Sequence, residues 1–138
     1  MKALRISTLA IVISILALSS TLFASTPETE KTKVEKNLKN FLLAMSCENT
    51  GVVESSIIIC VELKALYPQY DLKKVEDKLN SLAVDGETPV IRYRALLASL
   101  YYSNYPIFAN LKIVDKDNPE KTFRAIIDSI ENYRVASN

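Results

Sequence analysis

The 138-residue chain contains no histidine and no tryptophan, and it has only two glycines and two cysteines. Without histidine it lacks the usual general base, the commonest zinc ligand and every histidine-based catalytic triad. Two glycines are too few for glycine-rich loops that bind phosphate, and Cys47 and Cys60 alone do not form a zinc site. The sequence therefore predicts no catalytic residue, no cofactor and no metal site.

The first 24 residues differ from the rest of the chain. Lys2 and Arg5 precede an uncharged apolar run over residues 6–18, and a stretch rich in serine and threonine then ends at Ala24. This order is typical of a secretory signal peptide, so we expect cleavage after Ala24 and export to the periplasm or the extracellular space. A retained membrane anchor is the alternative, because the charge-free run over 6–24 approaches the roughly 20 residues that span a bilayer.

An excess of charge of either sign is also missing. The full chain has 17 basic and 16 acidic residues. Removal of residues 1–24 takes away Lys2 and Arg5 and leaves 15 basic against 16 acidic residues, a formal charge of −1. Such a balance gives no long-range attraction for nucleic acid or anionic lipid, so we expect a protein partner, no nucleic acid and no membrane for the mature chain.

After a segment predicted to be flexible at residues 25–32, apolar residues recur every three to four positions, as in amphipathic helices. The predicted helices cover residues 33–45, 52–67, 72–83, 90–104 and 121–133, with a shortened one within 107–114. The β-branched residues of 52–67 also suit a strand, but the run is longer than the usual 4–8 residues or so. Asp71, Pro89 and Asn118-Pro119-Glu120 are predicted to start helices, and Tyr105-Pro106 is predicted to end one.

The pattern of helices repeats along the chain. At an offset of 38 residues the alignment keeps the helix boundaries, and at an offset of 30 the strings YRALLASL and FRAIIDSI coincide. The aligned pairs include Val34 with Leu72, Thr50 with Thr88, Tyr67-Pro68 with Tyr105-Pro106, and Tyr93 with Phe123. The offsets predict three helix-turn-helix units, of which the last is shortened, as expected of a unit that caps a stack.

The string PVIRYRALLAS at residues 89–99 resembles the second helix of a HEAT repeat, in which an aliphatic residue and an arginine precede spaced small residues. Here these are Ile91, Arg92, Ala95 and Ala98. The resemblance covers about residues 33–134, and Glu54 and Thr122 take the place of the arginine in the flanking units. It implies an all-α fold, a short α-solenoid of about three antiparallel helix pairs, and a protein that binds other proteins and rarely catalyses.

Tyrosine is the residue type whose distribution points to recognition, because Tyr93, Tyr101, Tyr102 and Tyr105 concentrate around one helix. Tyrosine combines apolar area with a polar tip and is enriched at interfaces. We therefore expect a protein-binding surface that contains Arg92, Arg94, Tyr101 and Tyr102. In the alternative interpretation the tyrosines fill space between helices, and the arginines pair with Glu87 or a neighbouring acid.

The cysteines of an exported chain invite a disulfide. However, a helix that begins near Val52 places Cys60 about 12 Å of rise beyond the turn that carries Cys47, whereas a bridge needs Cα atoms within about 7 Å. We expect two unpaired thiols, with Cys60 in the core and Cys47 near the surface, and a single intramolecular disulfide is the alternative.

Carboxylate pairs are the remaining candidates for chemistry. Glu54 with Glu62, or Glu28 with Glu30, are nominal partners for glycoside hydrolysis, but we expect these carboxylates to lie on solvated helix faces. The string DKDNPE at 115–120 resembles the start of a calcium loop but lacks its glycine and its closing glutamate, so we expect a turn and a helix cap. The sequence thus predicts an exported, non-enzymatic scaffold that binds another protein, and the alternative is a carboxylate-dependent envelope hydrolase acting on glycan.

Overall fold

A computed structural model of the chain describes residues 29–111 and 118–136. The chain divides into two units between Lys33 and Val34, and the packing described below is that of the second unit. The helices are α2 (Glu30–Ala44), α3 (Thr50–Leu66), α4 (Lys73–Asp85), α5 (Pro89–Ser103), α6 (Tyr105–Phe108) and α7 (Pro119–Ala136). Strands are absent from the described residues, which confirms the predicted all-α class.

The β-branched run predicted as a helix forms α3. Asn49 caps its first turn, since the Asn49 side-chain oxygen accepts a hydrogen bond from the Val52 amide at 3.2 Å. Most of the apolar side chains on α3 are buried, and burial in tertiary contacts overrides the weak preference of valine and isoleucine against helices. Length and burial together therefore outweigh local propensity in this segment.

The helix start predicted at Pro89 is confirmed, whereas the cap predicted at Asp71 lies one residue too early, because Leu72 is the N-cap of α4. The Asp71 carboxylate accepts a hydrogen bond from the Lys73 amide at 3.0 Å, and Pro89 follows the Thr88 cap at the first position of α5. Tyr105-Pro106 behaves differently from the prediction. α5 ends at Ser103, and this pair begins the single turn α6, where the missing amide of proline leaves no internal hydrogen bond unmade.

Several predictions fall on residues outside the described ranges. These are the predicted signal peptide at residues 1–24 and the first three positions of the calcium-like turn, residues 115–117. α2 begins at Glu30, inside the segment predicted to be flexible. Within the described residues, none of the helices has both the length and the apolar character needed to cross a bilayer.

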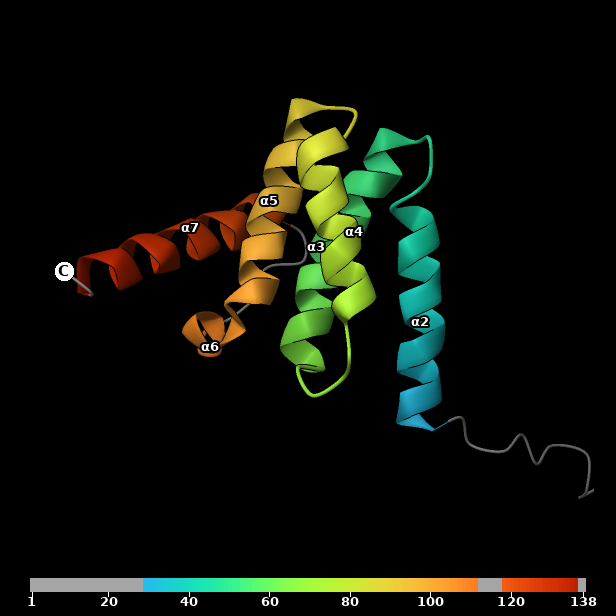
Figure 1. The fold of residues 1–138 in the computed structure, drawn as a ribbon, viewed down its shortest axis with the longest axis horizontal. Helices are drawn as coiled ribbons and strands as arrows, with labels where there is room; N and C mark the ends of the chain where they lie inside the picture. The colour runs from blue at the N-terminus through green and yellow to red at the C-terminus, as the bar shows by residue number, and fades with distance from the viewer. Residues whose placement is uncertain (1–28, 112–117, 137–138) are drawn as a thin grey trace, which may run out of the picture. The chain divides into compact units, whose positions relative to one another are not determined.

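α5 is the helix around which the second unit is packed. It contacts α3, α4, α6 and α7, and Figure 1 shows it beside α3 and α4 while α7 crosses it steeply. Ala95 and Ala98 are completely buried on α5, and their small side chains allow neighbouring helices to approach closely. The largest fully buried side chains come from every described helix except α2: Ile57, Cys60, Val61, Val75, Leu79, Ile91, Tyr101, Phe108, Phe123 and Ile126.

α2 joins this core through partly buried apolar residues, and the loop after it contributes Met45. The sulfur atoms of Met45 and Cys60 lie 3.9 Å apart in the core. Cys47 is exposed, and neither thiol takes part in a disulfide. The predicted unpaired cysteines, one buried and one at the surface, are confirmed.

Candidate functional site

Arg94, one of the predicted site residues, joins three helices. Its guanidinium projects from α5, donates to the Glu54 carboxylate of α3 at 3.0 Å and forms a second ion pair with Glu120 of α7. The guanidinium carbon also lies 5.7 Å from the centre of the Phe123 ring, within the range of a cation–π contact. Arg94 therefore holds α3, α5 and α7 together, and both of its charge partners are residues of the chain itself.

Arg92 lies two residues before Arg94 on α5 and contacts the turn that precedes this helix. Its guanidinium donates to the Gly86 carbonyl at 2.6 Å and to the Glu87 carbonyl at 3.5 Å. The sequence alternative paired Arg92 with the Glu87 side chain, whereas the structure pairs it with backbone carbonyls. This contact fixes the turn between α4 and α5.

Tyr101 and Tyr102 are buried, with 0% and 6% of their surfaces exposed. The Tyr101 ring packs against Tyr105 and Phe108, with ring centres 5.5 Å and 5.2 Å apart. The Tyr102 hydroxyl donates to the Cys60 carbonyl of α3. In this conformation a partner would meet neither side chain, and both fill space between helices as the alternative interpretation describes.

The surface of α5 instead carries an exposed row of apolar side chains that we call the α5 stripe: Val90, Tyr93, Leu96 and Leu100. These residues are between 37% and 50% exposed, and their spacing of three to four positions puts them on one face of the helix. The sequence shows this signal, because α5 is apolar at a second set of helical positions besides Ile91, Ala95 and Ala98. Sequence reasoning noted only Tyr93, as one of the clustered tyrosines.

Two hollows flank the α5 stripe where α7 approaches α5. Tyr93 lines the first, of about 320 Å³, together with Phe123 and Ile127 of α7. Leu100 lines the second, of about 200 Å³, with Ile107 and with apolar residues of α7. Hollows beside exposed apolar side chains provide places where side chains of a partner can be buried.

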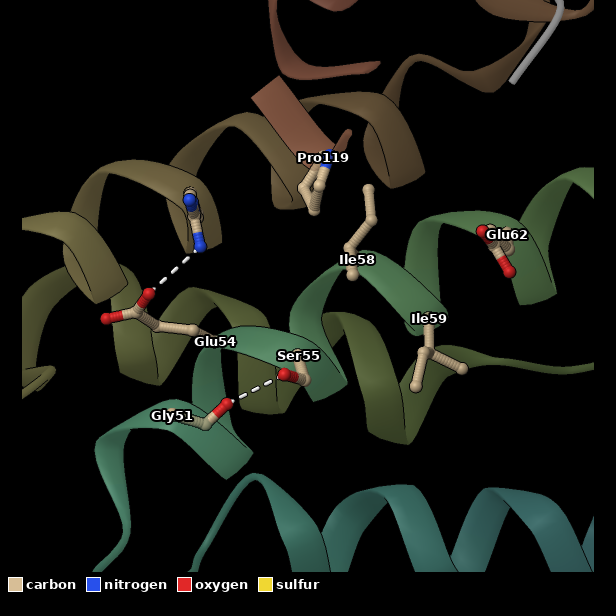
Figure 2. A pocket seen from close by; sticks show the side chains of 8 residues that line it. Gly51, Glu54, Ser55, Ile58, Ile59, Glu62 and Pro119 are labelled. Atoms are coloured by element: carbon tan, nitrogen blue, oxygen red, sulfur yellow. Dashed lines mark hydrogen bonds and ion pairs between the residues drawn. The ribbon is translucent and has the colours of Figure 1, made fainter. Parts of the chain in front are cut away.

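A third depression, which we call the α3 groove, follows one face of α3 and has a volume of about 450 Å³. Its lining residues are Gly51, Glu54, Ser55, Ile58, Ile59 and Glu62 of α3, Arg94 of α5 and Pro119 of α7. Figure 2 shows Glu54 and Glu62 at opposite ends, with Ile58 and Ile59 between them and Pro119 across from Ile58. The groove thus combines aliphatic side chains with carboxylates.

The carboxylates of the α3 groove differ in their partners. Glu54 is ion-paired with Arg94, whereas Glu62 is half-buried and has no hydrogen-bond or ion-pair partner among residues 29–111 and 118–136. Within the described residues, no cluster of acidic or cysteine side chains is able to hold a metal ion. Of the other nominal carboxylate pair, Glu28 and the side chain of Glu30 lie outside what the structure describes.

Comparisons of the chain with protein families, with curated proteins and with solved structures find no match. The function is therefore inferred from the chain's own residues and surfaces.

Proposed function

We propose that the chain is an exported, non-enzymatic helical-repeat protein that binds another protein through the α5 stripe. The observation that carries this proposal is the exposure of Val90, Tyr93, Leu96 and Leu100 on a helix whose opposite face lies in the core. Apolar surface gains about 25 cal/mol per Å² when it is removed from water, and exposed apolar patches with hollows mark interaction sites. An amphipathic helix of the partner matches the spacing of the stripe.

The helix boundaries support a repeat of the HEAT type. The cap residues Asn49 of α3 and Thr88 of α5 lie within one position of the predicted offset of 38, and Pro89 and Pro119 begin α5 and α7 at the predicted offset of 30. α4 packs against α5, and α5 packs against both α3 and α7, as neighbouring units of a stack do, whereas α2 and α3 of the first unit are not among the closely packed pairs of described helices. The third unit departs from the pattern, because its first described helix is the single turn α6.

Arg92, the arginine on which the resemblance to a HEAT repeat rests, does not link neighbouring helices. Arg92 binds carbonyls of the turn before its own helix, and the polar link between helices comes from Arg94 with Glu54 and Glu120. In the flanking positions Glu54 belongs to that link, and Thr122 is buried. The proposed repeat of helix pairs therefore has a different polar link between its helices, formed by Arg94 with Glu54 and Glu120.

The α5 stripe is tested by replacing Tyr93 and Leu96 together with glutamine, which is polar and a good helix former. We expect the double variant to lose the protein that the wild type captures in a cross-linking pull-down from envelope extract, with unchanged helicity by circular dichroism. Val84→Gln is the matched control, since Val84 is an exposed valine on α4. Equal capture by wild type and double variant would contradict the proposal.

Export is a separate part of the proposal and is supported by the basic, apolar and small residues of positions 1–24. The test is the N-terminal sequence of the protein recovered from the envelope fraction or the medium. We expect it to begin at Ser25. A chain that retains Met1 and stays in the membrane fraction would identify residues 6–24 as an anchor.

The alternative function, hydrolysis of glycan by Glu54 and Glu62, has one observation in its favour: both carboxylates line the α3 groove. Eight residues of helix separate them by about 12 Å of rise, more than the roughly 5–10 Å between carboxyl groups in glycosidases. Glu54 is also held by Arg94. Release of reducing sugar from envelope glycan by wild type but not by Glu62→Gln would favour this alternative.

A further inference from the structure

The α3 groove contains more negative than positive charge. Among its lining residues, Glu54 and Glu62 face the single cation Arg94. Arg94 is already bonded to Glu54 and to Glu120 at the edge of the groove, so its charge is shared between two carboxylates. Of the described residues that line the groove, none is a cation paired with Glu62.

The position of Glu62 makes this carboxylate available to a partner. The side chain is half-buried at one end of the groove, and it has no partner among the described residues. Its neighbour Ile59 is 39% exposed. A half-buried carboxylate beside aliphatic surface is screened less by solvent than a fully exposed one, and a cation that replaces its lost hydration forms a charge-assisted hydrogen bond.

We infer that the α3 groove binds a segment of the partner protein that carries a lysine or arginine beside aliphatic side chains, an inference that rests on the proposed function of protein binding. The cation of that segment pairs with Glu62, and its aliphatic side chains cover Ile59 and the floor formed by Gly51 and Ser55. The long aliphatic stems of lysine and arginine suit such a surface, because they pack on apolar groups while the charged end reaches a carboxylate.

Charge also determines what the groove rejects. An acidic segment would place its carboxylates beside Glu62 and Glu54, and like charges brought together at an interface oppose binding. The mature chain has a formal charge of only −1, so any preference for a cationic segment arises from this groove and not from a long-range field of the whole protein.

The experiment uses two fluorescein-labelled helical peptides with leucine at the same positions, one with lysine and one with glutamate at all the others, and measures fluorescence anisotropy with the purified protein. We expect tighter binding of the leucine–lysine peptide, weakened by added salt. Glu62→Gln should weaken that binding by roughly three- to tenfold, as loss of a partly desolvated ion pair does. Ile59→Gln should weaken it as well.

Glu87→Gln is the matched control, because it removes the same charge from an exposed position that does not line the groove, and we expect it to bind like wild type. The inference is overturned if Glu62→Gln and Glu87→Gln behave alike or if both peptides bind equally well. It is also overturned if Glu62→Gln changes the oligomeric state in size-exclusion chromatography, since a second copy would then occupy the groove.

The Tyr93→Gln, Leu96→Gln double variant separates this inference from the proposed function. Its changes lie outside the groove, so Glu62→Gln should weaken binding of the leucine–lysine peptide by the same factor in the double variant as in wild type. If the groove variants have no effect but the double variant still loses the captured protein, only the inference fails. If the double variant keeps the captured protein, the proposed function fails, whatever the peptides show.

Discussion

The Tyr102 hydroxyl of α5 donates a hydrogen bond of 2.6 Å to the backbone carbonyl of Cys60 in α3. This buried bond joins helices from two proposed repeat units. Its removal by Tyr102→Phe leaves the ring in place, so we expect the free energy of unfolding to fall by about 1 kcal/mol, the net contribution of a typical intramolecular hydrogen bond. Urea denaturation followed by circular dichroism measures the change.

Tyr101 provides the matched control for this prediction. Its hydroxyl is buried and finds no hydrogen-bond partner among the described residues, and a buried polar group without a partner destabilises the folded state. Tyr101→Phe should therefore leave the free energy of unfolding unchanged or raise it. Equal losses from the two phenylalanine variants would contradict the assigned bond.

Gly86 is predicted to tolerate no side chain. A Cβ atom at this position would lie 2.5 Å from the Leu82 carbonyl oxygen and 2.7 Å from a methyl carbon of Ile91. Gly86→Ala should lower the free energy of unfolding by about 1–3 kcal/mol, as overpacked sites do. Gly51→Ala is the comparison, because its new Cβ would meet only the Asn49 side chain at 3.3 Å, and thermal unfolding should show a smaller loss for it than for Gly86→Ala.

The two thiols should react at very different rates. Cys47 is exposed, whereas Cys60 is buried, and burial raises the pKa of the Cys60 thiol to about 12. Because the thiolate is the reactive form, we expect mass spectrometry after brief treatment with iodoacetamide at pH 8 to find one modified cysteine in the native protein and two in urea. If Cys60 in the native protein were labelled as fast as Cys47, its buried position in α3 would be contradicted.

The protein should lose stability at alkaline pH. Burial raises the pKa of Cys60, and it raises the pKa of Tyr101 and Tyr102 above the usual range of tyrosine. The unfolded chain releases these protons at lower pH than the folded chain does. The contribution of these three groups to the free energy of unfolding is therefore complete below about pH 8.5. Above this pH it declines by up to about 1.4 kcal/mol per pH unit for each group.

Urea denaturation at pH 8, 9, 10 and 11 measures this decline. The loss of stability from Cys60 begins at a lower pH than the loss from the tyrosines, because the ordinary pKa of cysteine is lower. Cys60→Ala should therefore flatten the profile between about pH 8.5 and 10, whatever its effect on stability at neutral pH. An unchanged slope in this variant would show that the Cys60 thiol does not control the alkaline loss.

Local patterns predicted most of the helices but not the start of α6, since Tyr105-Pro106 was predicted to end a helix and instead begins one. Pro89 begins α5, and the Asp71 carboxylate accepts a hydrogen bond from the first amide of α4, because such end contacts depend on neighbouring residues alone. Length separated helix from strand for α3. α7 was predicted in the same way, from the string FRAIIDSI, which coincides with YRALLASL at an offset of 30 residues.

Local sequence pattern was not sufficient to predict which side chains of α5 are exposed for binding. Tyr93 and Tyr101 are the same residue type on the same helix, yet Tyr93 is half exposed and Tyr101 is fully buried. Helical spacing places them on different faces of α5, but it does not tell which face other helices cover. Arg92 and Arg94 likewise differ only in the groups that other segments bring to them, a turn carbonyl for one and carboxylates of α3 and α7 for the other.

The sequence by itself determined the all-α class and the positions of most helices, and it favoured two unpaired cysteines over a disulfide, because each of these follows from residues close together in the chain. Tertiary structure alone decided that Tyr101 and Tyr102 lie in the core, that the α5 stripe is exposed, and that Glu62 has no partner among the described residues around the α3 groove. The reason is that exposure and charge pairing depend on how α6 and α7 pack against α5 and α3, which are contacts between residues far apart in the sequence.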